Sequence, residues 1–171
     1  MLRDFAIVAT AYGANFSDLK SSGKAGIFSL FFGVILSFSL GAIVAIAFGY
    51  DDPKDITTIG AGTVTFIVGP VSGSAIGASS EVIALSIAAG LVKSILVMTM
   101  TPLFAKRIGL DNPKSAMVFG GLMGTNSGVA AGLAAVDPKL VPYGAMTATF
   151  YTAVGCLLVP SVLFLLIDLM F

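Results

Sequence analysis

The chain has 171 residues, of which 57% are hydrophobic and 11% are charged, with a mean hydropathy of +1.02. Soluble domains carry roughly 25% charged residues, so this composition excludes an ordinary soluble domain and predicts an integral membrane protein. Nine basic residues balance nine acidic ones, so the charge predicts no nucleic-acid partner. The lone cysteine, Cys156, excludes an intrachain disulfide and is interpreted as a small packing residue.

The N-terminal apolar run, 5–16, is too short to cross a bilayer. We interpret it either as an interfacial or re-entrant piece, or as part of a helix in a chain that begins inside a longer protein. No cleavable signal peptide is evident before it.

Five longer apolar runs follow. Only one of them, 82–105, contains a charge, that of Lys93. Each run has the roughly 17–25 residues that a spanning helix needs, and none shows the alternation of a β-barrel strand. We therefore expect an all-α, polytopic membrane protein with about 4–6 membrane segments. The five runs are 25–49, 56–80, 82–105, 115–136 and 140–167.

The charges of the connectors predict the topology. The connectors 17–24 and 106–114 contain two and three basic residues and 137–139 contains Lys139, whereas 50–55 has three acids against one lysine. The positive-inside rule places the basic connectors in the cytoplasm and 50–55 outside. If every apolar run crossed once, 106–114 would return to the outside. Two re-entrant hairpins, one entering from each side of the membrane, remove this conflict.

We expect these hairpins around 69–80 and 120–132, each followed by a spanning helix, so that the two units form an inverted repeat. The predicted organisation is a single transmembrane transporter domain over the whole chain. Its parts are a partial segment and loop (1–24), a scaffold helix and loop (25–55), a first repeat (56–105) and a second repeat (106–171).

Both predicted hairpins contain a Gly- and Ser-rich motif, GPVSGSAIGASS at 69–80 and GGLMGTNSGVAAG at 120–132. Aligning Gly73 with Gly124 also aligns the next glycine of each motif, four residues later. Such segments weaken a membrane helix and expose backbone dipoles, and transporters built from inverted repeats bind substrate where they meet. The alternative is that both are close-packing faces of ordinary spanning helices.

The polar residues of these motifs are the candidate ligands, because a small ion at membrane depth needs amide donors, hydroxyls and carbonyl oxygens. Asn126 offers both a donor and an acceptor, with a helix-to-helix hydrogen bond as the alternative. Single serines often bond to their own helix. The predicted substrate-binding residues are Ser72, Gly73, Ser74, Ser79, Ser80, Lys93, Gly124, Thr125, Asn126 and Ser127. The predicted ion-binding residues are Glu81, Gly124, Asn126 and Ser127, and weaker candidates are Thr63 and Thr65.

Two charges lie within the long apolar stretch 56–105, those of Glu81 and Lys93. A charge at the bilayer centre costs about 2.5–3.5 kcal/mol on insertion scales, so each suggests a function. Glu81 is expected either to cap the following helix or to couple an ion. Lys93 lies roughly 18 Å further along that helix and is expected to pair with a dianionic substrate or with Glu81, or else to snorkel.

Enzyme signatures are missing from the sequence. It contains no histidine, no Gly-x-Ser-x-Gly and no Walker-type motif, and no cluster with metal-ligand spacing. We therefore predict no catalytic residue, no resident metal and no organic cofactor. Without an ATP site, transport would be driven by an ion gradient.

Five stretches of the sequence carry a resemblance to a known family. They are TIGAG (58–62), IVGPV (67–71), AIGASSEVIAL (75–85), FGGLMGT (119–125) and VPYGAMTATFY (141–151). Together they resemble the MadM subunit family of bacterial malonate transporters.

The resemblance covers essentially the whole chain and implies a sodium-coupled malonate importer, multi-pass in the bacterial inner membrane, that works with a smaller membrane subunit, MadL. Sodium is then the coupling ion, the bilayer surrounds the helices, and a homo-oligomer is left open. Family members are longer at the N-terminus, which agrees with a chain that begins inside a longer protein.

Two alternatives come from other classes. The order of hairpin, proline-ended helix, basic loop, second hairpin and final helix also resembles, more loosely, the LrgB group of membrane proteins linked to metabolite export and lysis control. The second alternative is a structural subunit that does not itself transport a solute. Uptake of labelled malonate into proteoliposomes, with and without sodium and MadL, separates them.

The hairpin topology makes a testable prediction. Cysteines introduced one at a time at 106–114 are expected to react with a membrane-impermeant reagent only from the cytoplasmic side, because two re-entrant hairpins keep this connector inside. Labelling from the outside would contradict the hairpins and favour full crossings.

Overall fold

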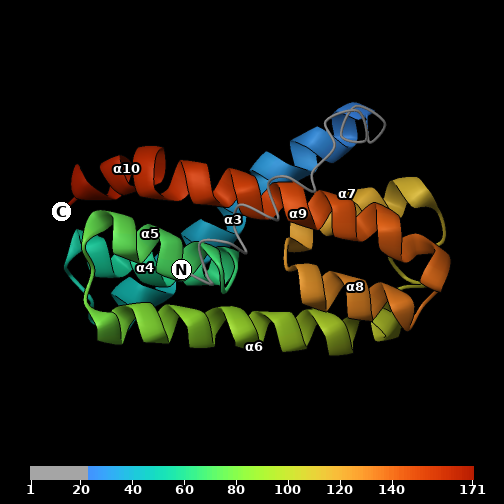
Figure 1. Cartoon of the computed structure of the whole chain (residues 1–171), viewed down its shortest axis with the longest axis horizontal. Coiled ribbons are helices and arrows are strands. Elements are labelled where there is room, and N and C mark those ends of the chain that lie inside the picture. Colours follow the sequence, from blue (N-terminus) through green and yellow to red (C-terminus); the bar gives the residue numbers. More distant parts are fainter. Residues whose placement is uncertain (1–22) are drawn as a thin grey trace. The chain divides into compact units, whose positions relative to one another are not determined.

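The computed structural model of the protein describes residues 23–171. The short N-terminal run at 5–16 lies outside the described residues, as does most of the first basic connector. Within 23–171 the secondary structure is helical and contains no strand, which confirms the all-α prediction (Figure 1). The helices are α3 (Gly23–Ala47), α4 (Pro53–Val64), α5 (Val68–Ile76), α6 (Ser80–Phe104), α7 (Pro113–Met123), α8 (Asn126–Ala134), η1 (Pro138–Leu140), α9 (Val141–Leu158), the π-helical η2 (Val159–Leu163) and α10 (Phe164–Asp168).

Within the described residues, three long helical segments are apolar enough to cross a membrane, namely Lys24–Ala47, Ser80–Phe104 and Pro138–Asp168. Large apolar side chains stand exposed along them, and Phe28 and Leu157 are 68% and 72% exposed. Such surfaces are unfavourable in water and suit a hydrocarbon solvent. The fold is therefore that of an all-α membrane protein.

Between these long helices the chain forms two helical hairpins of short arms. The first consists of α4 and α5, which lie side by side in Figure 1. The second consists of α7 and α8. Each first arm starts at an Asx-Pro pair, in which Asp52 or Asn112 caps the helix and proline occupies its first turn. The prediction of two interrupted apolar segments is confirmed.

The register of the predicted repeat is wrong. The first hairpin breaks at 65–67, before the Gly- and Ser-rich motif, and the second breaks at 124–125, inside its motif. Gly73 therefore lies within the second arm of its hairpin, whereas Gly124 lies between the arms. Glycine density predicted the motifs as equivalent, but Gly73 packs within a helix and Gly77 ends α5, whereas Gly124 lies at the break itself.

The structure gives a different register. The starts of α5 and α8, at 68 and 126, are 58 positions apart, as are the starts of α6 and η1, at 80 and 138. Both α5 and α8 have nine residues. Close contacts repeat at the same offset: a Cβ at Gly62 would meet the backbone oxygen of Ser86, and a Cβ at Gly120 would meet that of Gly144. Each first arm thus packs on the following long helix at an equivalent glycine.

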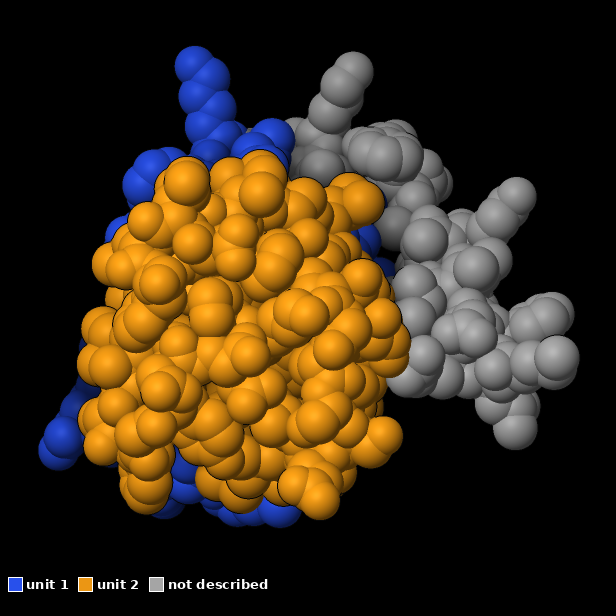
Figure 2. All heavy atoms as spheres, turned by 90° about the vertical axis from the view of Figure 1, so that its left-hand side faces the viewer, with its two compact units in different colours: residues 1–33, 94–153 blue, residues 34–93, 154–171 orange. Residues whose placement is uncertain are grey.

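The chain divides into two compact units, coloured in Figure 2. Of the described residues, unit 1 comprises 23–33 and 94–153, and it contains the second hairpin. Its apolar core joins α7, α8 and the start of α9. The buried members of this core are Ala105, Leu110, Ala116, Val129, Leu133, Leu140 and Ala148.

Unit 2 comprises 34–93 and 154–171 and contains the first hairpin. The last part of α9 packs against this hairpin, where Gly155 lies against Val64 and Val68. The predicted division into consecutive repeats, 56–105 and 106–171, stays a prediction. Buried side chains of unit 2 include Val34, Phe38, Ile56, Ile59, Val64, Val68, Val82 and Val159.

The equivalent glycines generate a stability prediction. Gly62→Val and Gly120→Val should each lower the free energy of unfolding by about 1–3 kcal/mol, because the new side chain meets a backbone oxygen that cannot move aside. Thermal unfolding in detergent, followed by circular dichroism, measures the effect.

The matched control adds the same side chain where there is room. Ala88 is exposed on α6, so Ala88→Val should change stability by less than about 0.5 kcal/mol. Equal melting temperatures for all three variants and the wild type would contradict the close packing of the hairpins.

Candidate functional site

The break of the second hairpin is sharp because Gly124 ends α7 in the left-handed region, with φ of +70°. A side chain there would be strained, and its Cβ would meet the Tyr151 ring. The chain then passes through the extended Thr125 and begins α8 at Asn126. Such a break leaves the last carbonyls of α7 and the first amides of α8 without helical partners.

Three hydroxyls form a network at this break. Ser94 Oγ, from α6, shares a hydrogen bond with Thr125 Oγ1 and another, of 2.8 Å, with Ser127 Oγ. Thr125 is fully buried. Its side chain is the N-cap of α8 but makes no capping hydrogen bond. The Thr125 hydroxyl is thus engaged by Ser94, and the first amides of α8 receive no acceptor from their own cap.

Asn126 places an unpaired oxygen at the same break. Its Nδ2 donates to Thr149 Oγ1 over 3.2 Å, and the Thr149 hydroxyl donates to the Ala145 carbonyl over 3.0 Å. Since the Thr149 hydroxyl donates its proton elsewhere, its oxygen accepts from the amide, which fixes Asn126 Oδ1 as the remaining acceptor. Asn126 Oδ1 is buried and has no hydrogen-bond partner. An unpaired buried acceptor is costly and suits a cation or an incoming donor.

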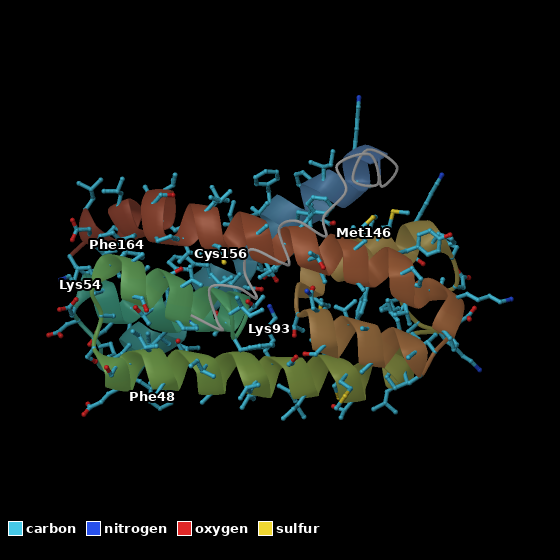
Figure 3. The ribbon with its side chains drawn as sticks, viewed as in Figure 1. Phe48, Lys54, Lys93, Met146, Cys156 and Phe164 are labelled. Carbon is cyan, nitrogen blue, oxygen red and sulfur yellow. The ribbon has the colours of Figure 1, made fainter. Side chains whose placement is uncertain are left out.

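The break of the first hairpin is built differently. Thr65 Oγ1 accepts hydrogen bonds from the backbone N–H groups of Ile67 and Val68, at 3.2 and 3.1 Å. Lys93 Nζ donates to the Val64 carbonyl and to Ser37 Oγ, each over 3.0 Å. Figure 3 shows the Lys93 side chain leaving α6 on the side of this hairpin. Backbone groups on both sides of the break therefore have side-chain partners within unit 2.

The weaker candidates of the first hairpin have structural partners. Thr63 Oγ1 lies 2.8 Å from the carbonyls of both Ser37 and Gly60. Thr65 caps α5 as described above. Both hydroxyls hold helices in place, as the alternative interpretation of single hydroxyls expects.

The serines of the first motif are spread along α5 and the start of α6. Ser72 is fully buried and its hydroxyl has no partner, while Ser74 is exposed. Gly73 packs against Thr58 and Ile83. Gly73 thus has the close packing that the alternative interpretation expects, and binding roles for Gly73 and the two serines stay predictions.

The residues at the start of α6 occupy capping positions. Ser79 Oγ accepts the N–H of Val82 over 3.3 Å. Ser80 and Glu81 are exposed, and Glu81 lies in the first turn of α6, where a carboxylate interacts favourably with the helix dipole. Their predicted binding roles are not tested by these contacts.

The predicted site residues thus gather at one place in unit 1 and are spread over several places in unit 2. In unit 1 the structure brings Gly124, Thr125, Asn126 and Ser127 together at one break, as the motif predicts. The expectation that both hairpins supply one pocket stays a prediction.

Several site residues were missed by the sequence analysis. Ser94 and Thr149 are single small polar residues in apolar helices, which hydropathy cannot distinguish from hydroxyls bonded to their own helix. Tyr151, whose hydroxyl donates to the Gly33 carbonyl over 3.1 Å, stands 58 positions after Lys93. The correct repeat register would have identified it.

A separate groove of about 310 Å³ lies in unit 1 between α6 and α7. Apart from Thr101, its lining is apolar, with residues such as Met100 and Phe104, so it does not suit a charged solute. Among residues 23–171, no three acidic, cysteine or histidine side chains come together as a metal site.

Comparison with known proteins identifies the family. Neither the curated proteins nor the solved structures provide a match. The profile of the malonate/sodium symporter MadM subunit matches residues 1–171, which is the whole chain. The apolar spanning helices agree with a transporter subunit. The chain therefore belongs to the MadM family of malonate/sodium symporter subunits.

Proposed function

We propose that the protein is the membrane subunit of a sodium-coupled malonate importer, and that malonate and sodium bind at the break of the second hairpin. The family supports the solutes. The observation that carries the location is the buried, unpaired Asn126 Oδ1 beside a helix N-terminus that its own cap leaves open. An anion needs the free amide donors and a cation needs the free oxygen, so the two solutes could bind together there.

The anion is bound by donors. The first amides of α8 carry the partial positive charge of a helix N-terminus, and α8 has nine residues over which the dipole develops. Ser94 and Ser127 add hydroxyls beside it. One carboxylate of malonate, a small dianion, accepts hydrogen bonds from these groups in place of water.

The cation is bound by oxygens. Asn126 Oδ1 and the carbonyls at the end of α7 supply the kind of ligand that hard cations prefer, at the negative end of a helix dipole. Opposite charges held at one break attract each other, so bound malonate raises the affinity for sodium and bound sodium raises the affinity for malonate equally. This mutual stabilisation couples the two solutes.

The setting follows the family. We place the protein as a multi-pass subunit in the bacterial inner membrane, acting with MadL as a transporter and not as an enzyme. The three spanning segments support this. The LrgB-like and structural-subunit alternatives both predict no sodium-dependent malonate uptake, so reconstituted MadM and MadL, assayed together and singly, distinguish them.

Asn126→Ala tests the location. Removing the unpaired oxygen should weaken the apparent affinity for sodium by about 10- to 100-fold, since hydrogen bonds and contacts to charged groups are worth roughly 1.5–3 kcal/mol. Uptake of labelled malonate into MadM–MadL proteoliposomes, measured over a range of sodium concentrations, gives the value.

Asn126→Asp is the matched variant. It retains an oxygen at the same place and adds a negative charge, so it should bind sodium at least as well as the wild type while binding malonate more weakly. Undiminished uptake by Asn126→Ala, at wild-type protein levels, would remove the second hairpin from the site.

Ser94→Ala tests the hydroxyl network. It should raise the malonate concentration for half-maximal uptake by about 3- to 10-fold, because the Thr125 hydroxyl then becomes available to cap α8 and competes with the carboxylate. The control is Ser86→Ala, on the same helix, whose hydroxyl bonds only to the Ile83 carbonyl among the hydrogen bonds described. Equal effects of the two substitutions would mean that Ser94 acts in packing alone.

A further inference from the structure

The break of the first hairpin holds a lysine ammonium that belongs to the protein. Lys93 Nζ donates to the carbonyl of Val64, the last residue of α4, and to Ser37 Oγ, each over 3.0 Å. A helix C-terminus carries a partial negative charge, so the ammonium lies where a cation is favoured. These acceptors are a carbonyl and a hydroxyl, the oxygen types that also bind sodium.

The second hairpin has a different residue at the equivalent position. The repeat offset of 58, given by the starts of α5 and α8 at 68 and 126, places Tyr151 opposite Lys93. The Tyr151 ring packs at Gly124, and its hydroxyl donates to the Gly33 carbonyl. Between Lys114, in the first turn of α7, and Lys139 the sequence has no basic residue. The second break therefore receives no ammonium from residues 115–138 or from this position of the long helix.

The other side of each break shows the same contrast. Thr65 caps α5 by accepting from two amides, whereas Thr125 makes no capping bond to α8. At the first break a cation and an acceptor are both supplied by side chains. At the second, Asn126 Oδ1 is buried without a partner.

We infer that Lys93 is a built-in cation that takes the place of an exchangeable sodium ion at the first hairpin, so that the coupled sodium binds only at the second. This inference rests on the proposed sodium coupling. It adds that the first hairpin holds a fixed cation and that the second binds the exchangeable sodium. Lys93 then neutralises the end of α4 permanently, and the first hairpin goes through the transport cycle without an exchangeable ion.

The test counts sodium ions. Purified MadM–MadL complex is equilibrated with ²²Na⁺ in the absence of malonate, and bound sodium per MadM chain is measured for the wild type, Lys93→Met and Lys93→Arg. Lys93→Met should bind one sodium ion more than the wild type, because the Val64 carbonyl and the Ser37 hydroxyl lose their cation. Lys93→Arg keeps the charge and should bind the same number as the wild type.

A second measurement can be made even if a Lys93 variant is too unstable for the binding assay. Melting temperatures are compared in sodium chloride and in choline chloride for the wild type, Lys93→Met and Lys93→Gln. Sodium should raise the melting temperature of the two neutral variants more than that of the wild type, since the ion restores a missing charge.

Two results would overturn the inference. One is unchanged sodium binding by Lys93→Met together with lost malonate binding, which would make Lys93 a substrate ligand. The other is a neutral variant that shows no additional response to sodium in either measurement. Because neither assay uses malonate transport, failure of the proposed function would appear separately, as normal uptake by Asn126→Ala.

Discussion

Backbone groups that lose their helical partners must be satisfied inside the membrane, and this constraint governs the architecture. A lipid-facing break would leave amides and carbonyls in hydrocarbon at several kcal/mol each, so breaks occur only where protein or a polar solute can reach them. Both hairpins of this chain are interrupted, at 65–67 and at 124–125. Around each break, small residues allow the arms and long helices to approach, as at Gly62 and Gly120.

The two breaks meet this constraint in different ways, and the difference lies in where one hydroxyl points. Thr65, at the start of the first break, accepts from the amides that begin the following helix α5, whereas Thr125 is engaged by Ser94. One serine on α6 therefore decides whether the amides of α8 are capped from within. Lys93, beside it in the chain, serves the other hairpin. Repeated segments of similar length can thus differ in function through a few side chains on the helices that flank them.

Much of the fold follows from hydropathy and charge, because a spanning helix needs a long apolar run and a basic connector resists crossing. The register of the repeat, that is, which residues of the two hairpins are equivalent, did not follow from hydropathy and charge. Glycine marks both close packing and helix termination, so Gly73 and Gly124 look alike in sequence although one packs on Thr58 and the other ends a helix. The first break contains Thr65 and no glycine, and so carries no compositional signal. The place of Asn126 at the break was predictable because a side-chain amide is conspicuous in an apolar run, whereas the contact of Ser94 with this break was not.

If malonate and sodium bind at the second break, as proposed, the unpaired groups of that break also affect how the transport of the two solutes is coupled. When the site is empty, Asn126 Oδ1 and the first amides of α8 rely on water, and when only one solute is bound an unbalanced charge remains. Moving such a state through a low-dielectric region leaves polar groups uncompensated, at roughly 1–3 kcal/mol for each unmet hydrogen bond and more for a charge. In the state with both solutes bound, sodium offsets part of the charge of the malonate dianion and the open donors and acceptors are occupied, so these costs are smallest. On the inference made for Lys93, the charge at the first break belongs to the protein and contributes equally to every state. Selective movement of the doubly loaded carrier can therefore arise from one unsatisfied hairpin.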